Sequence, residues 1–275
     1  MSVKTPALLE LRNAVRFWFQ KLEANSKVCI GVSGGADSLA LAIVAKLEAV
    51  DFNLDLVAVI VDHGLQENSA EVAASTKKKL ESIGYSDIFV GKANVLVTDG
   101  IEASARRARY LVFQQALETY GAKVFLIGHT KNDQAEGVLL GLARGSGTKS
   151  LSGMQEVSGI FIRPLLGIDR TTTEIACSEA GIEFWNDPHN SNHDFTRVRV
   201  RENILPLLEN EIGPGIADAL ARSAKILRED ATALDEWAEK VFAQVDPMDI
   251  EISTLESLPV AVRSRVLRLA IYAAG

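Results

Sequence analysis

Residues 28–50 read VCIGVSGGADSLALAIVAKLEAV, and this stretch decides the fold. The largely apolar residues 28–32 predict a buried strand, and residues 39–50 predict a helix. Between them, Gly34 and Gly35 permit a sharp turn and a close approach of the backbone to a ligand. A helix that begins near Ser38 directs its unpaired N–H groups and its positive dipole end into the turn, which predicts an anion site, most often for phosphate. A plain turn capped by serine and aspartate is the alternative, because a lone glycine-rich turn is a weak signal.

The turn differs from a Walker A loop, because the chain contains no Gly-x-x-x-x-Gly-Lys-Ser/Thr motif. Asp37 would repel phosphate groups unless a cation lay between them, which favours Mg²⁺ held by oxygen ligands. The run Ser-Gly-Gly-Ala-Asp-Ser at 33–38 resembles the signature of the PP-loop ATP pyrophosphatases, which cleave ATP to AMP and pyrophosphate. The resemblance implies ATP as the bound nucleotide. Its expected contacts within the turn are Ser33, Gly34, Gly35, Ala36, Asp37 and Ser38.

Length and composition limit the class of protein. The chain has 275 residues, 47% of them hydrophobic, which is enough for one large α/β core and a small second unit. Its formal charge of −7 argues against RNA binding through overall basicity, so an RNA contact would need local arginines. Cys29 and Cys177 are far apart and are expected to be core thiols. Without a signal segment or a long apolar run, a cytoplasmic protein without a membrane partner is expected.

Apolar runs and helical patterns alternate along the chain. Strands are expected at 54–61, 88–90 and 123–127, and helices at 6–22, 68–83 and 101–120. This order predicts an α/β fold with a doubly wound, mostly parallel sheet. Ligands bind at the carboxyl ends of such strands, where the strand order reverses. The residues that follow the strands and are expected to border the nucleotide are Asp62, His63 and Gly128.

Several charged residues also lie at or near these strand ends. Asp133 and Glu136 are three apart at the start of the helix that follows the strand at 123–127. They can share one face beside the strand end, but Asp-x-x-Glu is also typical of a capping box. Arg106 and Arg109 share one face of the preceding helix, where a solvated salt bridge from Glu102 to Arg106 is the simpler interpretation.

A longer series of motifs resembles the tRNA(Ile)-lysidine synthetases. The matching runs are VDHGL at 61–65, EASARRARY at 102–110, GHTKNDQAE at 128–136, RGSG at 144–147, RPLL at 163–166, DPHN at 187–190 and FTRVRVR at 195–201. Together with the turn they cover residues 28–206 in the order of the family. Thr130, Asn132 and Gly137 depart from the family pattern, which leaves the roles of these three positions open.

The resemblance implies an ATP-dependent ligase that joins L-lysine to C2 of the wobble cytidine (position 34) of tRNA(Ile) with a CAU anticodon. AMP is first transferred to the base with release of pyrophosphate, and the lysine amine then displaces AMP. The product, lysidine, changes the codon and amino-acid specificity from Met to Ile. The implied catalytic residues are Asp37, which holds Mg²⁺, Arg106, His129, and the lysine-binding pair Asp133 and Glu136.

The densest basic stretch of the sequence suggests how an acidic protein binds tRNA. Arg197, Arg199 and Arg201 alternate in the run FTRVRVR, where they are either helix-surface charge or phosphate contacts. The full set of expected tRNA contacts is Arg109, Arg144, Arg163, Arg197, Arg199 and Arg201. We expect a PP-loop catalytic domain at 1–205 with an adenine nucleotide alpha hydrolase-like fold, and a helical domain at 206–275. Whether the C-terminus is natural, and whether the protein is a homodimer, is left open.

Two other functions compete with the ligase. A PP-loop tRNA thiolase would require reactive cysteines, and neither Cys29 in a strand nor the distant Cys177 suits that role. A nucleotide-binding protein without catalysis would be favoured if Arg106, Asp133 and Glu136 served only the fold.

Overall fold

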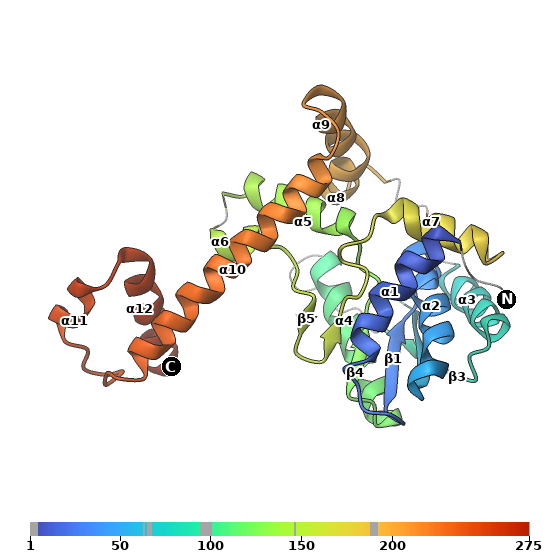
Figure 1. The fold of residues 1–275 in the computed structure, drawn as a ribbon, viewed down its shortest axis with the longest axis horizontal. Helices are drawn as coiled ribbons and strands as arrows, with labels where there is room; N and C mark the ends of the chain where they lie inside the picture. Colours follow the sequence, from blue (N-terminus) through green and yellow to red (C-terminus); the bar gives the residue numbers. More distant parts are fainter. Residues whose placement is uncertain are drawn as a thin grey trace. The chain divides into compact units, whose positions relative to one another are not determined.

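The computed structural model describes residues 5–62, 64, 68–93, 101–145, 147–187 and 192–274, with the backbone alone at 101–103. Backbone contacts divide the chain into two units (Figure 1). The first comprises Met1–Glu136 and Gln155–Ala217, and the second comprises Gly137–Met154 and Asp218–Gly275. The assignment of residues 1–205 to a catalytic domain and 206–275 to a helical domain stays a prediction.

The first unit is built on a six-stranded sheet with the order β3-β2-β1-β4-β6-β5. Its strands are β1 (Lys27–Gly31), β2 (Asp55–Asp62), β3 (Asp87–Lys92), β4 (Val124–Leu126), β5 (Val157–Ser158) and β6 (Phe161–Ile162). Neighbouring strands are parallel except for β5 and β6. The predicted doubly wound, mostly parallel sheet is therefore confirmed, although the β5–β6 hairpin was not expected.

Helices cover both faces of this sheet (Figure 1). Val28 and Ile30 of β1 belong to one core, which also contains residues of α1 (Pro6–Phe19), α2 (Ala36–Phe52), α3 (Ser69–Ile83) and α7 (Arg170–Glu179). The intervening Cys29 lies in a second core with α4 (Ile101–Tyr120). Successive strand residues point to opposite faces, so near-continuous apolar strands are what a sheet covered on both sides requires.

The order of the strands reverses between β1 and β4. The chain winds outward through β1, β2 and β3 on one side, whereas β4 pairs with the other edge of β1, with Val28 opposite Val124. The residues after β1 and β4 therefore share the switch point where ligands of such sheets bind.

Helical segments carry the remaining residues. After β4 comes α5 (Lys131–Ala143), and residues 196–211 form α8 (Thr196–Arg199), a π-helical turn (Val200–Ile204) and α9 (Leu205–Glu211) in direct succession. A π-helical turn often marks a functional site, because it redirects the side chains around it.

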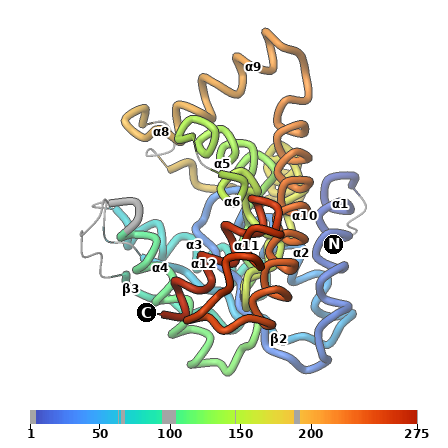
Figure 2. Tube along the Cα trace, turned by 90° about the vertical axis from the view of Figure 1, so that its left-hand side faces the viewer, coloured from blue at the N-terminus to red at the C-terminus, as the bar shows by residue number. Residues whose placement is uncertain are grey.

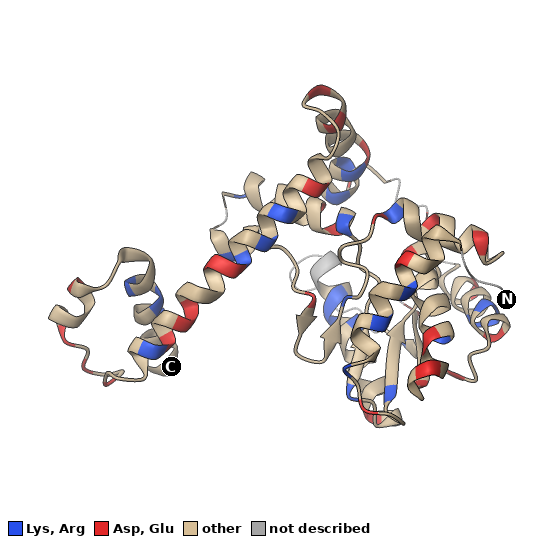
Figure 3. Ribbon diagram, viewed as in Figure 1, with Lys and Arg blue, Asp and Glu red and all other residues tan. Residues whose placement is uncertain are grey.

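The second unit is helical. It contains α6 (Thr148–Leu151), most of α10 (Ile216–Phe242), α11 (Ile252–Ser257) and α12 (Val260–Ala274). Ala238 of α10 and Val262 and Val266 of α12 form its buried core, and Figure 2 follows the chain through these helices. Residues of both charge signs lie along α10 (Figure 3). None of the helices in the described parts of the chain is long and apolar enough to cross a membrane.

Candidate functional site

The turn at residues 33–38 joins β1 to α2, which begins at Ala36 with Gly35 as its N-cap. Gly35 has no side chain to cap the helix, so the first N–H groups of α2 remain available to a ligand. Ser38 braces the turn, because its Oγ accepts the N–H of Ser33 at 3.1 Å and donates to the carbonyl oxygen of Gly35 at 3.0 Å. A turn with these unpaired N–H groups has the geometry that an anion site requires, and the site itself stays a prediction.

Close contacts at the turn explain why glycine occupies position 34 in the turn and position 128 after β4. Gly34 has a φ of +90°, and a Cβ there would lie 2.5 Å from Oγ1 of Thr76. A Cβ on Gly128, just after β4, would lie 2.9 Å from the carbonyl oxygen of Asp37. From the opposite side, the N–H of Trp185 donates to the carbonyl oxygen of Gly34 at 2.9 Å. Backbone packed this closely leaves a defined cradle that larger residues would distort.

Asp37 in the first turn of α2 is bonded to α7. Its carboxylate lies 3.2 Å from Nε of Arg170 and accepts the hydroxyl of Thr173 at 2.5 Å. Burial raises the pKa of Asp37, and the positive charge of Arg170 partly opposes that effect. One carboxylate beside a phosphate cradle fits Mg²⁺, which proteins commonly hold through one or two carboxylates together with the phosphates of a nucleotide. Asp37 would therefore hold the ion jointly with ATP.

Asp133 and Glu136 at the start of α5 have different partners. The Oδ2 atom of Asp133 accepts the N–H of Thr130 at 2.9 Å and its hydroxyl at 3.1 Å, so Asp133 is the third residue of a capping box that begins at Thr130. Glu136 is fully buried and is bonded to two arginines. Nε of Arg201 lies 2.6 Å away and Nε of Arg197 lies 2.8 Å away. The capping box considered from the sequence, Asp133 with Glu136, is therefore wrong, because Asp133 pairs with Thr130 and Glu136 is bonded to the arginines.

Arg170 contacts all three carboxylates and was missed by the sequence analysis. In addition to its bond with Asp37, its Nη2 lies 3.4 Å from Asp133 and its Nη1 lies 3.9 Å from Glu136. The N–H of Arg170 donates to Oδ1 of Asn132 at 2.9 Å, which joins α7 to α5 and gives this departure from the family pattern a structural role. Its place four residues after the run RPLL was the only available signal.

We use the name catalytic cluster, after the role proposed for it below, for Asp37, Asp133, Glu136, Arg170, Arg197 and Arg201. Burial alone would raise the pKa of Asp133, but the charge of Arg170 and the N–H of Thr130 hold it below its usual value. Burial lowers the pKa of the neighbouring His129 to about 4, which keeps its ring neutral at pH 7. No described residue bonds to the buried Nδ1 atom of His129.

The other predicted residues lie in varied surroundings. Arg106 is exposed on α4, with its guanidinium 5.3 Å from the ring centre of Tyr110, and Arg109 and Arg144 are also exposed. Arg163 is only 6% exposed and donates to the carbonyl oxygen of Gln155 at 2.8 Å.

The remaining residues singled out in the sequence are Arg199, Asp62 and several positions that the structure does not fully describe. Arg199 bonds to the carbonyl oxygens of His193 and Asp194. Asp62 at the end of β2 accepts the N–H of Gly64 at 3.1 Å. His63, the side chain of Glu102, and residues 188–190 of the DPHN run lie outside the described residues.

Comparison with known proteins places these features in a family. A PP-loop domain model matches residues 9–208. The tRNA(Ile)-lysidine synthase of Leifsonia xyli is 46% identical, with 92% of this chain and 78% of that protein covered. The synthases of Thermobifida fusca and Rhodococcus erythropolis are 44% and 47% identical and are covered over 86% and 82% of their lengths. The chain belongs to the tRNA(Ile)-lysidine synthase family.

Membership in the tRNA(Ile)-lysidine synthase family confirms the resemblance drawn from the motifs, and with it a PP-loop, ATP-binding enzyme of tRNA modification. The structure also resembles the U34-tRNA thiolase NcsA from Methanococcus maripaludis, with a TM-score of 0.68 over 81% of this chain and 79% of that one. At 20% identity this likeness concerns the fold alone.

The cysteines count against thiolase chemistry in this chain. Burial raises the pKa of Cys29 to about 11 and that of Cys177 to about 12, so both stay protonated at neutral pH. A thiol is a nucleophile only as the thiolate. These two side chains are therefore better explained as core thiols than as reactive groups.

Proposed function

We propose that this enzyme ligates free L-lysine to C2 of the wobble cytidine of tRNA(Ile) with a CAU anticodon, through an adenylated tRNA. The observation that carries the proposal is the position of two carboxylates, Asp133 and Glu136, directly after β4. That strand pairs with β1, which leads into the phosphate turn. A site for an ammonium group thus adjoins a site for ATP, as a lysine ligase requires.

The first step would transfer AMP to the base. The C2 oxygen of cytosine attacks the α-phosphorus of ATP, a new P–O bond forms, and the bond to the bridging oxygen breaks with departure of pyrophosphate. The free N–H groups at the start of α2 face the charge that develops on the leaving group. Mg²⁺ held by Asp37 would supply further neutralisation of that charge. Arg106 is proposed to act on the same charge.

The second step would place the lysine amine on C2. The neutral amine attacks, the C2–O bond breaks, AMP departs with that oxygen, and the amine loses a proton. Free lysine has an amine pKa near 10.4, so the site must favour the neutral form at the moment of attack. Because its lowered pKa keeps Asp133 ionised, Asp133 is better suited to binding an ammonium group than to accepting a proton. Glu136 is then the acceptor to test.

Both steps require the catalytic cluster to rearrange. Arg197 and Arg201 already satisfy Glu136, and Arg170 occupies the space between Asp37 and Asp133. The lysine amine can pass its proton to Glu136 only after an arginine releases that carboxylate. Phosphates of tRNA offer Arg197 and Arg201 an alternative partner, and the phosphates of ATP offer one to Arg170. We therefore expect tRNA to bind before lysine, with the two affinities coupled.

The remaining tRNA contacts form part of the same proposal. Arg109, Arg144 and Arg199 are exposed and can reach a phosphate without a change of fold. Arg163 would have to leave its buried bond to Gln155, so we expect it to contribute least. The cytidine itself must leave the anticodon stack before C2 can be attacked.

The test of the function is direct. The purified chain is incubated with ATP, Mg²⁺, radiolabelled lysine and a tRNA transcript with a CAU anticodon, and label in the tRNA is measured. A transcript with uridine at the wobble position is the matched control and should stay unlabelled. Lysine-independent sulfur transfer would support a thiolase, and nucleotide binding without either product would support a non-catalytic protein.

A further inference from the structure

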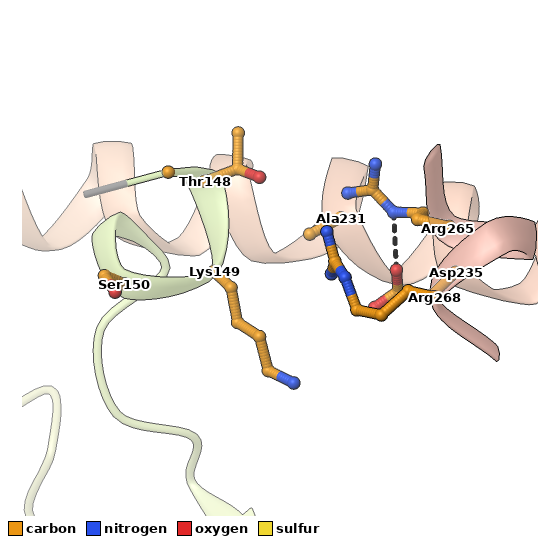
Figure 4. A pocket seen from close by; sticks show the side chains of 8 residues that line it. Thr148, Lys149, Ser150, Ala231, Asp235, Arg265 and Arg268 are labelled. Atoms are coloured by element: carbon orange, nitrogen blue, oxygen red, sulfur yellow. Dashed lines mark hydrogen bonds and ion pairs between the residues drawn. The ribbon is translucent and has the colours of Figure 1, made fainter. Parts of the chain in front are cut away.

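A small pocket in the second unit is lined by three helices (Figure 4). Its cavity is about 170 Å³, and its lining residues are Gly147, Thr148, Lys149, Ser150, Ala231, Asp235, Arg265 and Arg268. They belong to α6 and the residue before it, to α10 and to α12. None of them was among the residues expected to bind a substrate.

Bonds between the helices hold the walls of this pocket in place. Arg228 of α10 donates twice to the carbonyl oxygen of Ser152 at the end of α6, at 2.6 and 3.1 Å. Arg265 of α12 donates from Nε to the carboxylate of Asp235 on α10 at 2.5 Å (Figure 4). Ala238 of α10 also packs with Val262 and Val266 of α12 in the buried core of the unit. The pocket is therefore a fixed feature of the unit.

The pocket carries a surplus of positive charge. Lys149, Arg265 and Arg268 bring three positive charges and Asp235 one negative charge, which leaves two. Asp235 is paired with Arg265, so Arg265 serves the fold. Lys149 and Arg268 are exposed, and neither has an ion pair or hydrogen bond with any residue that the structure describes. Two such cations beside the hydroxyls of Thr148 and Ser150 form a site for an anion.

The size and composition of the pocket indicate which anion fits. A small-molecule site usually measures about 300–1,000 Å³, so a cavity of this volume suits a phosphate group better than a whole nucleotide. No aromatic side chain lines it on which a base could stack. In a chain with a charge of −7, a local pair of cations is the kind of feature that RNA binding requires.

We propose that this pocket binds a backbone phosphate of the RNA substrate, through Lys149 and Arg268. The contact would position the RNA without reading its sequence. It rests on the proposed function only in taking tRNA as the substrate. The second unit contains none of the catalytic cluster. Loss of the phosphate contact in the pocket should therefore raise the KM for tRNA and leave kcat unchanged.

The test uses a charge-matched pair of double variants in the full chain. Lys149→Gln with Arg268→Gln removes the two pocket cations, and Arg222→Gln with Lys240→Gln removes two exposed cations of α10 that do not line the pocket. The dissociation constant for tRNA is measured between about 50 and 200 mM salt. We expect the pocket variant to bind roughly tenfold more weakly and its salt slope to fall by about one to two, relative to the control.

Two outcomes would overturn the proposal. If the pocket variant binds tRNA with the affinity and salt slope of the control, the pocket does not contact RNA. If calorimetry shows that it has lost binding of inorganic phosphate while its tRNA affinity matches the control, the pocket holds a free anion instead. Wild-type chain that binds tRNA but transfers no lysine would refute the proposed function without touching this result.

Discussion

The two charged regions of this enzyme differ in how their cations are satisfied. In the catalytic cluster, Arg170, Arg197 and Arg201 each lie within 4 Å of at least one carboxylate, and Glu136 at the centre is fully buried. In the pocket of the second unit, Lys149 and Arg268 are exposed and have no partner among the described residues. The cations of the catalytic cluster are paired with internal carboxylates, whereas the two cations of the pocket are available to an anion.

Buried, paired charges and exposed, unpaired charges contribute differently to stability and to binding. Removal of one member of a buried ion pair leaves the other uncompensated, which costs about 3–5 kcal/mol. Ligands of the catalytic cluster must therefore exchange with internal partners, and binding there is coupled to the fold. Exposed cations without partners contribute little to stability, so they can serve binding alone. The expected effects below run from the largest to the smallest.

Replacement of Asp37 should have the largest effect on activity. Asp37→Ala removes the carboxylate that is expected to hold Mg²⁺ beside the phosphates, so pyrophosphate release should fall about 10³-fold or more while the fold persists. Release is measured at saturating ATP and tRNA across a range of Mg²⁺ concentrations. Asp169→Ala, which removes a half-exposed carboxylate paired with Lys131, is the control. Release at the wild-type rate in Asp37→Ala would show that the turn binds its ligand without this residue.

Glu136→Gln should separate the two steps of the reaction. Gln cannot accept the proton that the lysine amine loses, so lysine transfer should fall about 10²-fold while adenylation of tRNA continues. A single-turnover experiment that follows adenylated tRNA and lysidine separately should show the adenylate accumulating. If adenylation is blocked and lysine affinity is unchanged, the carboxylate belongs to the ATP site and the division of roles is wrong.

The local parts of this site could be predicted from the sequence. The strand, turn and helix around residues 33–38 follow from an apolar pattern broken by adjacent glycines. The proximity of residues 128–136 to that turn follows from the rule for strand-order reversal, which the pairing of β1 with β4 confirms. Both inferences depend only on contacts within one element or between neighbouring strands.

The partners of the carboxylates could not be predicted in this way. Arg170 reaches Asp37 across 133 positions, and Arg197 reaches Glu136 across 61. No periodicity connects residues so far apart, and an alternating run of arginines is compatible with either a tRNA surface or an internal ion pair. The grouping of Gly137–Met154 with the C-terminal helices is equally non-local.

Stability should distinguish paired from unpaired cations. Arg201→Ala leaves the buried Glu136 with one fewer donor, so the free energy of unfolding should fall by about 3 kcal/mol. Arg268→Ala should change it by less than about 0.5 kcal/mol, because the side chain is exposed. Urea denaturation of the two variants and the wild type gives the comparison. Equal losses in both variants would mean that the two regions do not differ as described.

The pH dependence of the free energy of unfolding should report on His129, the histidine beside the buried catalytic cluster. An unfolded chain binds a proton on histidine near pH 6.5, whereas the native pKa of His129 is about 4. Between these values the unfolded state binds more protons, so this histidine's contribution to stability is complete above pH 6.5 and is lost as the pH falls to 4.

His129→Gln should abolish that contribution and flatten the decrease in unfolding free energy between pH 6.5 and 4 by roughly 2 kcal/mol. His193→Gln, at a histidine whose side chain is 52% exposed, is the control for loss of a histidine outside the cluster. Urea denaturation of the three proteins at half-unit intervals of pH gives the profiles. If the His129→Gln profile falls in parallel with the wild-type profile, the native pKa of His129 lies near its unfolded value of about 6.5. Its ring would then become a cation below that pH in a cluster that already contains three arginines, and it would approach the lysine ammonium group as a like charge.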